Sequence, residues 1–363
     1  MDVNASIAPE IVAEFTDAWP SGIAVSRSGR VFVSFPRVEE PPAPITLAEI
    51  IDGKAIPFPD ELVNAIDPTD TAHRFVSVHG IALGPGNRLL VLDTAANSFD
   101  GCDPKAAKLW IIDLDSNTIV HGITFPDDVV LPTTYLNDLV IDSTRGKNGF
   151  AYITDSGSKG PNGIIVVDLD SGRSWRRLSG HASVRGTPRD GFAIAAEGEL
   201  VMMRDAAGNT QPVTVGCDGI ALSPDAKRLW WTPLSTYGLY SVDVDALVDP
   251  QTTDDRIART VTAHDEREFA CDGLDCDREG RVYFTDATNS AVQRFLPAEN
   301  RYERLFSDPR MIWPDAIELA PDRTIYITSS QIHRGPQYNR GVDRRERPYR
   351  LFRAAIDADP GQF

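Results

Sequence analysis

The sequence predicts an all-β fold, a six-bladed β-propeller, and three observations lead to it. First, a two-strand phrase recurs six times along the 363 residues. Second, further strand-like segments follow the copies, which brings the content to about four strands per repeat, as in a propeller blade. Third, strand-like segments near the two ends of the chain can complete one blade together. We therefore expect one six-bladed domain over residues 1–363.

The recurring phrase opens with a small polar or acidic residue and a Gly-like position. An alternating apolar strand, a short turn and a second apolar strand follow, which is a hairpin signal. The six copies are SGIAVSRSGRVFVSF from Ser21, HGIALGPGNRLLVLDT from His79, NDLVIDSTRGKNGFAYITDS from Asn137, DGIALSPDAKRLWWTPL from Asp218, DGLDCDREGRVYFTDA from Asp272 and DAIELAPDRTIYITSS from Asp315.

The sixth copy supplies two strands and YRLFRAAI a third, so its blade lacks an outer strand. The segment EIVAEF near the N-terminus can fill this place, and such a closure removes the open edges of the ring. The longest gap between copies contains GFAIAA and ELVMMR, which predict an additional hairpin.

Charge and composition limit the partners. Lys and Arg total 36 against 53 Asp and Glu, a net charge of −17. This charge repels phosphate backbones and anionic lipid surfaces, which argues against nucleic acid and membranes as partners. The segment MDVNASIAPEIVAEF lacks the pattern of a secretory signal. If Met1 is the native start, we expect a cytoplasmic protein; the sequence does not indicate its oligomeric state.

The four cysteines, none of them in a C-x-x-C pair, are predicted to be thiols. We also find no G-x-S-x-G elbow, P-loop, G-x-G-x-x-G after a strand or H-E-x-x-H. These absences argue against an α/β serine hydrolase, a nucleotide-binding enzyme and a zincin.

The first strand of each propeller blade lies nearest the axis, so the residues that open the six copies should converge on one mouth of the channel. They are Ser21, His79, Asn137 with Asp138, Asp218, Asp272 and Asp315. Carboxylates around a narrow pore repel one another and need a cation, hydrogen-bond donors or shared protons. Oxygen ligands suit Ca²⁺ or Mg²⁺, and a raised-pKa Asp or His79 could act as acid or base. The alternative is structural, because Asp-Gly pairs also stabilise tight backbone turns.

Aromatic residues precede several of these positions. Trp19, Trp313 and Tyr135 could wall a pocket for a flat or apolar ligand, and packing in the core is the alternative. His333, in a polar loop of the last blade, could line the mouth, and a solvated loop is the alternative.

The ordered set of phrases, from WPSGIAVSRSGRVFVSFPR to SSQIHR and DRRERPYRLFR, resembles the major royal jelly protein/Yellow family in its bacterial branch. The resemblance implies a six-bladed propeller distantly similar to the SMP-30/gluconolactonase group, lactone hydrolases with one axial divalent cation. By motif, Asp218 and Asp272 match metal-ligand positions, and Asn137 matches an Asn beside metal and substrate. Ser21 stands where that group has a Glu ligand, which removes one anionic ligand.

The first functional expectation is a lactone hydrolase that acts on a cyclic or carbonyl substrate. Asp218 and Asp272 would hold the cation, Asn137 would orient a carbonyl oxygen, and His79 or Asp315 would move protons. The expected substrate contacts are Ser21, Trp19, Asp138, Trp313 and His333. The alternatives are an isomerase of the dopachrome-conversion type, a non-catalytic small-molecule-binding propeller and a scaffold for protein partners.

Overall fold

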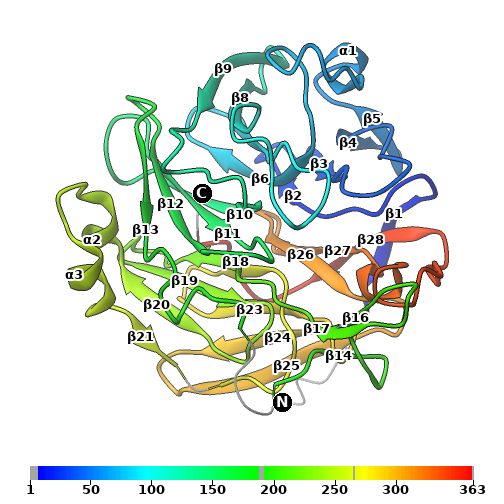
Figure 1. Cartoon of the computed structure of the whole chain (residues 1–363). Helices are drawn as coiled ribbons and strands as arrows, with labels where there is room; N and C mark the ends of the chain where they lie inside the picture. The colour runs from blue at the N-terminus through cyan, green and yellow to red at the C-terminus, as the bar shows by residue number, and fades with distance from the viewer. Residues whose placement is uncertain (1–6, 188–191, 265, 362–363) are drawn as a thin grey trace.

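The computed structural model describes residues 7–187, 192–264 and 266–361. Six four-stranded antiparallel sheets stand around a common axis, as Figure 1 shows. The inner strands β2, β6, β10, β18, β22 and β26 each contact the inner strands of both neighbouring sheets, which closes the ring. The predicted six-bladed propeller is confirmed.

The strands of each blade are given from the axis outward. Blade 1 is β2 (Ile23–Val25), β3 (Val31–Ser34), β4 (Leu47–Ile51) and β5 (Lys54–Pro57). Blade 2 is β6 (Val78–Gly84), β7 (Arg88–Asp93), β8 (Lys108–Asp113) and β9 (Thr118–Thr124). Blade 3 is β10 (Leu136–Asp142), β11 (Phe150–Asp155), β12 (Gly163–Asp168) and β13 (Ser174–Arg177). Blade 4 is β18 (Cys217–Leu222), β19 (Arg228–Pro233), β20 (Tyr240–Asp243) and β21 (Thr262–Ala263). Blade 5 is β22 (Leu274–Cys276), β23 (Val282–Asp286), β24 (Ala291–Leu296) and β25 (Arg301–Ser307). Blade 6 is β26 (Pro314–Leu319), β27 (Thr324–Ser329), β28 (Tyr349–Ala355) and β1 (Glu10–Phe15).

The N-terminal strand closes the last blade as predicted. β1 pairs antiparallel with β28, with Glu10 opposite Arg353 and Phe15 opposite Tyr349. Cross-strand ion pairs of 3.1 Å join Arg353 to Glu10 and Arg350 to Glu14. β1 therefore covers an edge that β28 would otherwise expose.

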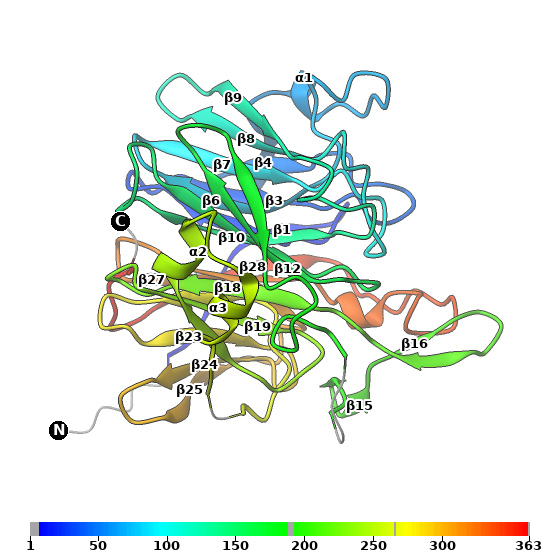
Figure 2. The ribbon, with the colours of Figure 1, turned by 60° about the vertical axis from the view of Figure 1, so that its left-hand side comes forward.

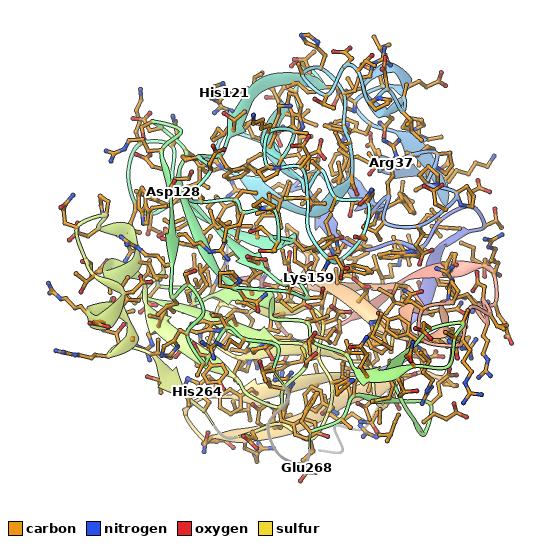
Figure 3. The ribbon with its side chains drawn as sticks, viewed as in Figure 1. Arg37, His121, Asp128, Lys159, His264 and Glu268 are labelled. Carbon is orange, nitrogen blue, oxygen red and sulfur yellow. The ribbon has the colours of Figure 1, made fainter. Side chains whose placement is uncertain are left out.

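Burial falls from the second strand of a blade to its outermost strand. All residues of β3 and β23 are buried, whereas β9 is mostly exposed. Figure 3 shows His121 of β9 at the rim of blade 2. Apolar side chains of adjacent blades fill the space between the sheets: Leu109 of blade 2 and Val167 of blade 3 belong to one buried cluster.

The helical segments are short: α1 (Glu61–Asn64), α2 (Val244–Val248), α3 (Asp254–Ala258) and the 3₁₀ turn η1 (Ile332–Arg334). None of the helices in the described part of the chain is long and apolar enough to span a bilayer.

An insert between blades 3 and 4 forms two hairpins. β14 (Ala195–Ala196) pairs with β15 (Glu199–Leu200), and β16 (Met202–Arg204) pairs with β17 (Thr210–Pro212). The predicted hairpin between GFAIAA and ELVMMR exists, but ELVMMR is divided at Val201 between the two pairs. Figure 2 shows this insert projecting from one face of the ring.

The Gly-like position of the repeat has a structural cause. A Cβ on Gly80 would lie 2.5 Å from the carbonyl oxygen of Asn137, and one on Gly273 would lie 2.6 Å from that of Asp315. Gly22 and Gly219 face the carbonyl oxygens of the next blades in the same way. Glycine therefore lets the inner strands of blades 1, 2, 4 and 5 approach the backbone of the next blade.

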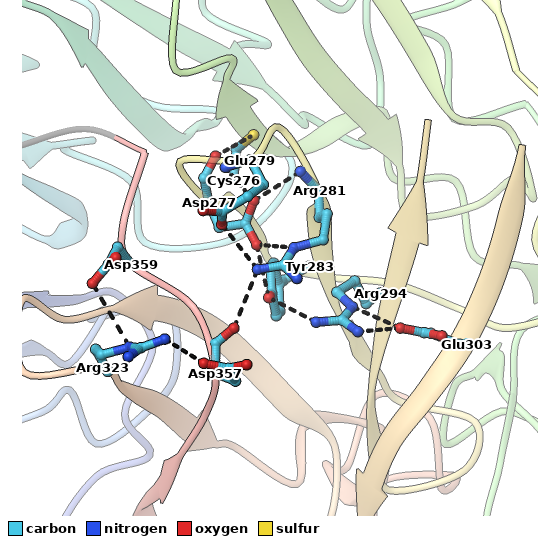
Figure 4. Close-up of polar contacts among 10 residues, drawn as sticks. All are labelled: Cys276, Asp277, Glu279, Arg281, Tyr283, Arg294, Glu303, Arg323, Asp357 and Asp359. Carbon is cyan, nitrogen blue, oxygen red and sulfur yellow. Dashed lines mark hydrogen bonds and ion pairs between the residues drawn. The ribbon is translucent and has the colours of Figure 1, made fainter. Parts of the chain in front are cut away.

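After β28 the chain crosses to blade 5 at the face opposite the insert (Figure 2). Pro360 forms a β-bridge with Asp277, and the amide of Gly361 donates to the carbonyl of Cys276 over 2.9 Å. Figure 4 shows Arg323 paired with Asp357 and Asp359, and Arg281 within 3.2 Å of the Asp357 carbonyl oxygen.

Candidate functional site

An axial cavity opens where the six inner strands begin. It contains about 540 Å³ of empty space, part of it open to solvent. Its polar floor consists of His79, Asn137, Ser156, Asp218, Asp272 and Asp315. Its walls are apolar: Trp19, Phe99, Leu234, Trp313, Ile332 and Tyr338, together with Val201, Val213 and Val215 of the insert. The site thus combines an acidic floor with an aromatic and aliphatic upper part.

A hydrogen-bonded chain joins four blades on one side of the floor. The Ser21 hydroxyl contacts Asp315 Oδ1 over 3.0 Å and His79 Nε2 over 2.8 Å. On the other side of its ring, His79 Nδ1 lies 2.6 Å from the hydroxyl of Tyr135. Each residue comes from the start of an inner strand or from the segment before it, so the ring geometry brings them together.

The hydrogen bonds from Asp315 through Ser21 and His79 to Tyr135 allow two arrangements of the protons. With Asp315 ionised, Ser21 donates to Asp315, His79 Nε2–H donates to Ser21, and Tyr135 donates to Nδ1. With Asp315 protonated on Oδ1, all three hydrogen bonds reverse and His79 carries its proton on Nδ1. Burial lowers the pKa of His79 to about 3, so the ring stays neutral in both arrangements. A proton on Asp315 Oδ1 would therefore change the His79 tautomer.

On the other side of the floor, the Asn137 amide donates to Ser156 Oγ over 2.9 Å and also to Asp218 Oδ1. Asp272 accepts a 2.7 Å bond from the indole nitrogen of Trp313. Each floor residue is thus held by a side chain of the same or a neighbouring blade.

The three floor carboxyls share one electrostatic environment. Burial, followed by the charge of Asp272, raises the pKa values of Asp218 and Asp315 well above their ordinary range. Burial raises the pKa of Asp272 to about 6, although the hydrogen bond from Trp313 lowers it. The charge of the buried Arg267 lowers the pKa of Asp218, but its donors bond carbonyl oxygens of residues 233, 236 and 238. The hydrogen bonds that Asp315, Asp218 and Asp272 accept from Ser21, Asn137 and Trp313 come from neutral donors.

Most residues predicted for the site converge. His79, Asn137, Asp218, Asp272, Asp315, Trp19 and Trp313 line the cavity. Ser21 is buried directly behind them, where it bridges His79 and Asp315.

Asp138 and His333 lie elsewhere than expected. Asp138 follows Asn137, and successive side chains of a strand point in opposite directions. It lines a second cavity further along the axis with Asp275, Glu318 and Pro360. His333 stands behind the cavity wall, with its ring stacked on Trp313 at 5.2 Å and 21°.

Eight residues that line the cavity were not predicted from the sequence: Phe99, Ser156, Leu234, Ile332, Tyr338 and the three valines of the insert. Ser156 ends the phrase AYITDS of the third copy, so its position in the repeat is a usable signal. The valines follow from no local pattern, because the path of the insert over the mouth is set by tertiary contacts.

The predicted divalent cation would use Asp218 and Asp272. Among the described residues, no group of three or more His, Cys, Asp or Glu side chains is placed to hold a metal ion. Both carboxyls instead accept hydrogen bonds from Asn137 and Trp313. In this structure both carboxyls are engaged by neutral donors, and the cation stays a prediction.

Cys102, Cys217, Cys271 and Cys276 are free thiols, as predicted. Burial raises the pKa values of all four. Their thiols are therefore poor nucleophiles and serve the packing of the blades.

Solved structures with similar folds are propeller proteins of several kinds. A luciferin-regenerating enzyme superposes with a TM-score of 0.58 at 12% identity, over 98% of this chain and 97% of that chain. Regucalcin from Agrobacterium tumefaciens, a calcium-binding protein, gives 0.56 at 14% identity over 98% and 96%. A gluconolactonase from Xanthomonas campestris gives 0.55 at 12% identity over 96% and 89%. At these identities the likeness concerns the fold alone.

Sequence relatives are more specific. Major royal jelly protein 7 of Apis mellifera is 27% identical over 188 residues, which is 50% of this chain and 38% of that protein. Major royal jelly protein 3 of the same organism is 29% identical over 182 residues, or 48% and 30%. The alignments thus span about a third of these relatives' lengths. The family profile described as Major royal jelly protein matches residues 76–360, most of the propeller, and the chain therefore belongs to the major royal jelly protein family.

Proposed function

We propose that the axial cavity binds a small organic molecule that combines an apolar or aromatic body with a cationic amine group. One observation carries the proposal: Asp218, Asp272 and Asp315 share the floor of an apolar-walled cavity and accept hydrogen bonds from neutral donors. Carboxyls grouped in this way repel one another when ionised. A cationic ligand supplies the missing positive charge.

The walls support the second half of the proposal. Trp19, Phe99 and Trp313 contribute aromatic surface to the cavity that the carboxyls line. Aromatic faces attract both flat rings and cations, and cavities that bind small molecules commonly combine apolar walls with few polar groups. An amine at the floor and a ring between these walls would use both parts of the cavity.

The test compares 2-phenylethylamine with its neutral analogue 2-phenylethanol by isothermal titration calorimetry. We expect the amine to bind at least about tenfold more tightly at neutral pH, which is a difference of about 1.4 kcal/mol in binding free energy. Asp218→Asn and Asp272→Asn should each reduce the preference for the amine. The matched control is Asp138→Asn, which removes an axial carboxyl that lines the other cavity. Equal affinity for both probes would contradict the proposal.

Catalysis is the second candidate, and the chain from Asp315 through Ser21 to His79 favours it. A carboxyl with a raised pKa in an apolar cavity can give or take a proton near neutral pH. This supports proton transfer on a cyclic or carbonyl substrate, either lactone hydrolysis or an isomerisation of the dopachrome-conversion type. The gluconolactonase among the similar structures shares the architecture that such a reaction would use.

Turnover of a δ-lactone panel and of dopachrome, each with and without chelator, separates these reactions and tests the cation. Loss of lactone hydrolysis on chelation, restored by Ca²⁺ or Mg²⁺, would establish both the cation and the hydrolase. Unchanged turnover in both His79→Ala and Asp272→Ala would remove the catalytic candidate.

A further inference from the structure

The insert between blades 3 and 4 forms the roof of the axial cavity. Val201 and Val213 are buried and, with Val215, line the same cavity as the floor carboxyls. These valines belong to one apolar cluster with Trp313 and Tyr338 of the cavity wall. We name residues 192–215 the roof insert.

A loop of blade 6 holds the roof insert in place. Glu197 forms a two-point ion pair with Arg334, with distances of 2.7 Å to Nε and 2.6 Å to Nη2, and it lies 2.8 Å from His333 Nε2. The hydrogen bond from the Arg334 guanidinium lowers the pKa of Glu197 to about 2, so Glu197 stays charged at neutral pH. Backbone bonds of 2.8 and 2.9 Å join Arg204 to Gln337 and Arg340.

The same contacts lead to the floor of the cavity. The ring of His333, which donates its Nε2–H to the ionised Glu197, stacks on the indole of Trp313 at 5.2 Å. The indole nitrogen of Trp313 donates to Asp272 over 2.7 Å. Glu197 is therefore connected to a floor carboxyl through two aromatic side chains, although it does not line the axial cavity itself.

We propose that the roof insert determines ligand size, and that Glu197 is a positioning residue that holds both the roof and the Trp313–Asp272 pair. The inference rests on the proposed function, because it assigns the two ends of the ligand to opposite sides of the cavity. The ring of an aromatic amine lies under the valines, and its ammonium group lies at the carboxyls.

The first experiment measures selectivity. In Val201→Ala and Val213→Ala the roof recedes, so affinity for the two-ring amine tryptamine should rise relative to 2-phenylethylamine by about tenfold, the lower end of the range that one methylene-sized change in an apolar pocket gives. Val120→Ala, at a half-exposed position on β9, is the control and should leave the ratio unchanged. A constant ratio in both roof variants would overturn the role of the roof.

The second experiment isolates Glu197. Glu197→Gln should weaken 2-phenylethylamine binding by about threefold or more, consistent with loss of a partly exposed charge pair. Glu199→Gln, in the same hairpin and exposed, is the control. Trp313→Phe keeps an aromatic ring but loses the donor to Asp272. Glu197→Gln should therefore reduce the affinity for 2-phenylethylamine by a smaller factor in the Trp313→Phe variant than in the wild type. The exchanged pair, Glu197→Arg with Arg334→Glu, again places opposite charges at the two positions. It should therefore bind 2-phenylethylamine more tightly than Glu197→Arg alone.

The outcomes distinguish the two proposals. If the wild type binds neither amine, the proposed function fails. If it binds 2-phenylethylamine but Glu197→Gln behaves like Glu199→Gln while both remain folded by circular dichroism, the positioning role of Glu197 fails and the amine site stands.

Discussion

Ser21 Oγ lies 2.8 Å from His79 Nε2, although these residues open neighbouring blades and stand 58 positions apart in the sequence. The contact arises because the inner strands converge on the axis. It gives His79 a partner on each ring nitrogen, since Tyr135 bonds the other side. The imidazole is thus buried, neutral and fixed in orientation.

The first prediction concerns the protonation of this ring. Burial lowers the pKa of His79 to about 3, so we expect its ¹⁵N NMR signals to remain those of a neutral imidazole from pH 8 to about pH 4. In Ser21→Ala the ring should stay neutral, but its tautomer should no longer follow the protonation of Asp315. Imidazolium signals that appear near pH 6.5 in the folded protein would contradict the buried assignment.

The second prediction is the pH dependence of amine binding. Asp272 has a pKa of about 6, raised by burial, and its ionised form attracts the ammonium group. Affinity for 2-phenylethylamine should therefore rise by about tenfold between pH 5 and pH 7, because the amine stays protonated throughout this window. Asp272→Asn should flatten the rise, and 2-phenylethanol should show none. A calorimetric titration series at several pH values makes the comparison.

How much the sequence predicts depends on whether a feature belongs to the repeat. The six blades, the closure by β1 and the convergence of His79, Asn137 and Asp218 all follow from the recurring phrase. Asp138 was assigned to the same mouth because it adjoins Asn137, and strand alternation sends it to the other cavity. The roof valines and the link from Glu197 to Trp313 depend on how two irregular loops meet, which no periodicity encodes.

The third prediction tests the close approach of inner strands. A Cβ on Gly80 would lie 2.5 Å from the Asn137 carbonyl oxygen, and backbone atoms cannot rotate away as a side chain can. Gly80→Ala should therefore destabilise the fold by about 1–3 kcal/mol, as overpacking does. The sixth copy carries Ala316 at the equivalent position, so Ala316→Gly is the matched control and should cost about 1 kcal/mol or less. Urea unfolding gives both values, and similar losses for the two variants would contradict the packing argument.

The last prediction concerns the second axial cavity, where Asp138 lies. Burial raises the pKa of Asp138 to about 7 from an ordinary value near 3.8. The folded chain therefore holds this proton more tightly than the unfolded chain, and its stability falls as the pH rises from about 4 to about 7. Asparagine cannot ionise, so Asp138→Asn should be more stable than the wild type at pH 8, by up to about 4 kcal/mol, and nearly equal to it at pH 4.

Thermal unfolding of both proteins across this pH range measures the difference. Asp128→Asn, at an exposed position labelled in Figure 3, supplies the control for the charge change alone. A stability difference for Asp138→Asn that is the same at pH 4 and pH 8 would show that the carboxyl is as well solvated in the folded protein as in the unfolded chain.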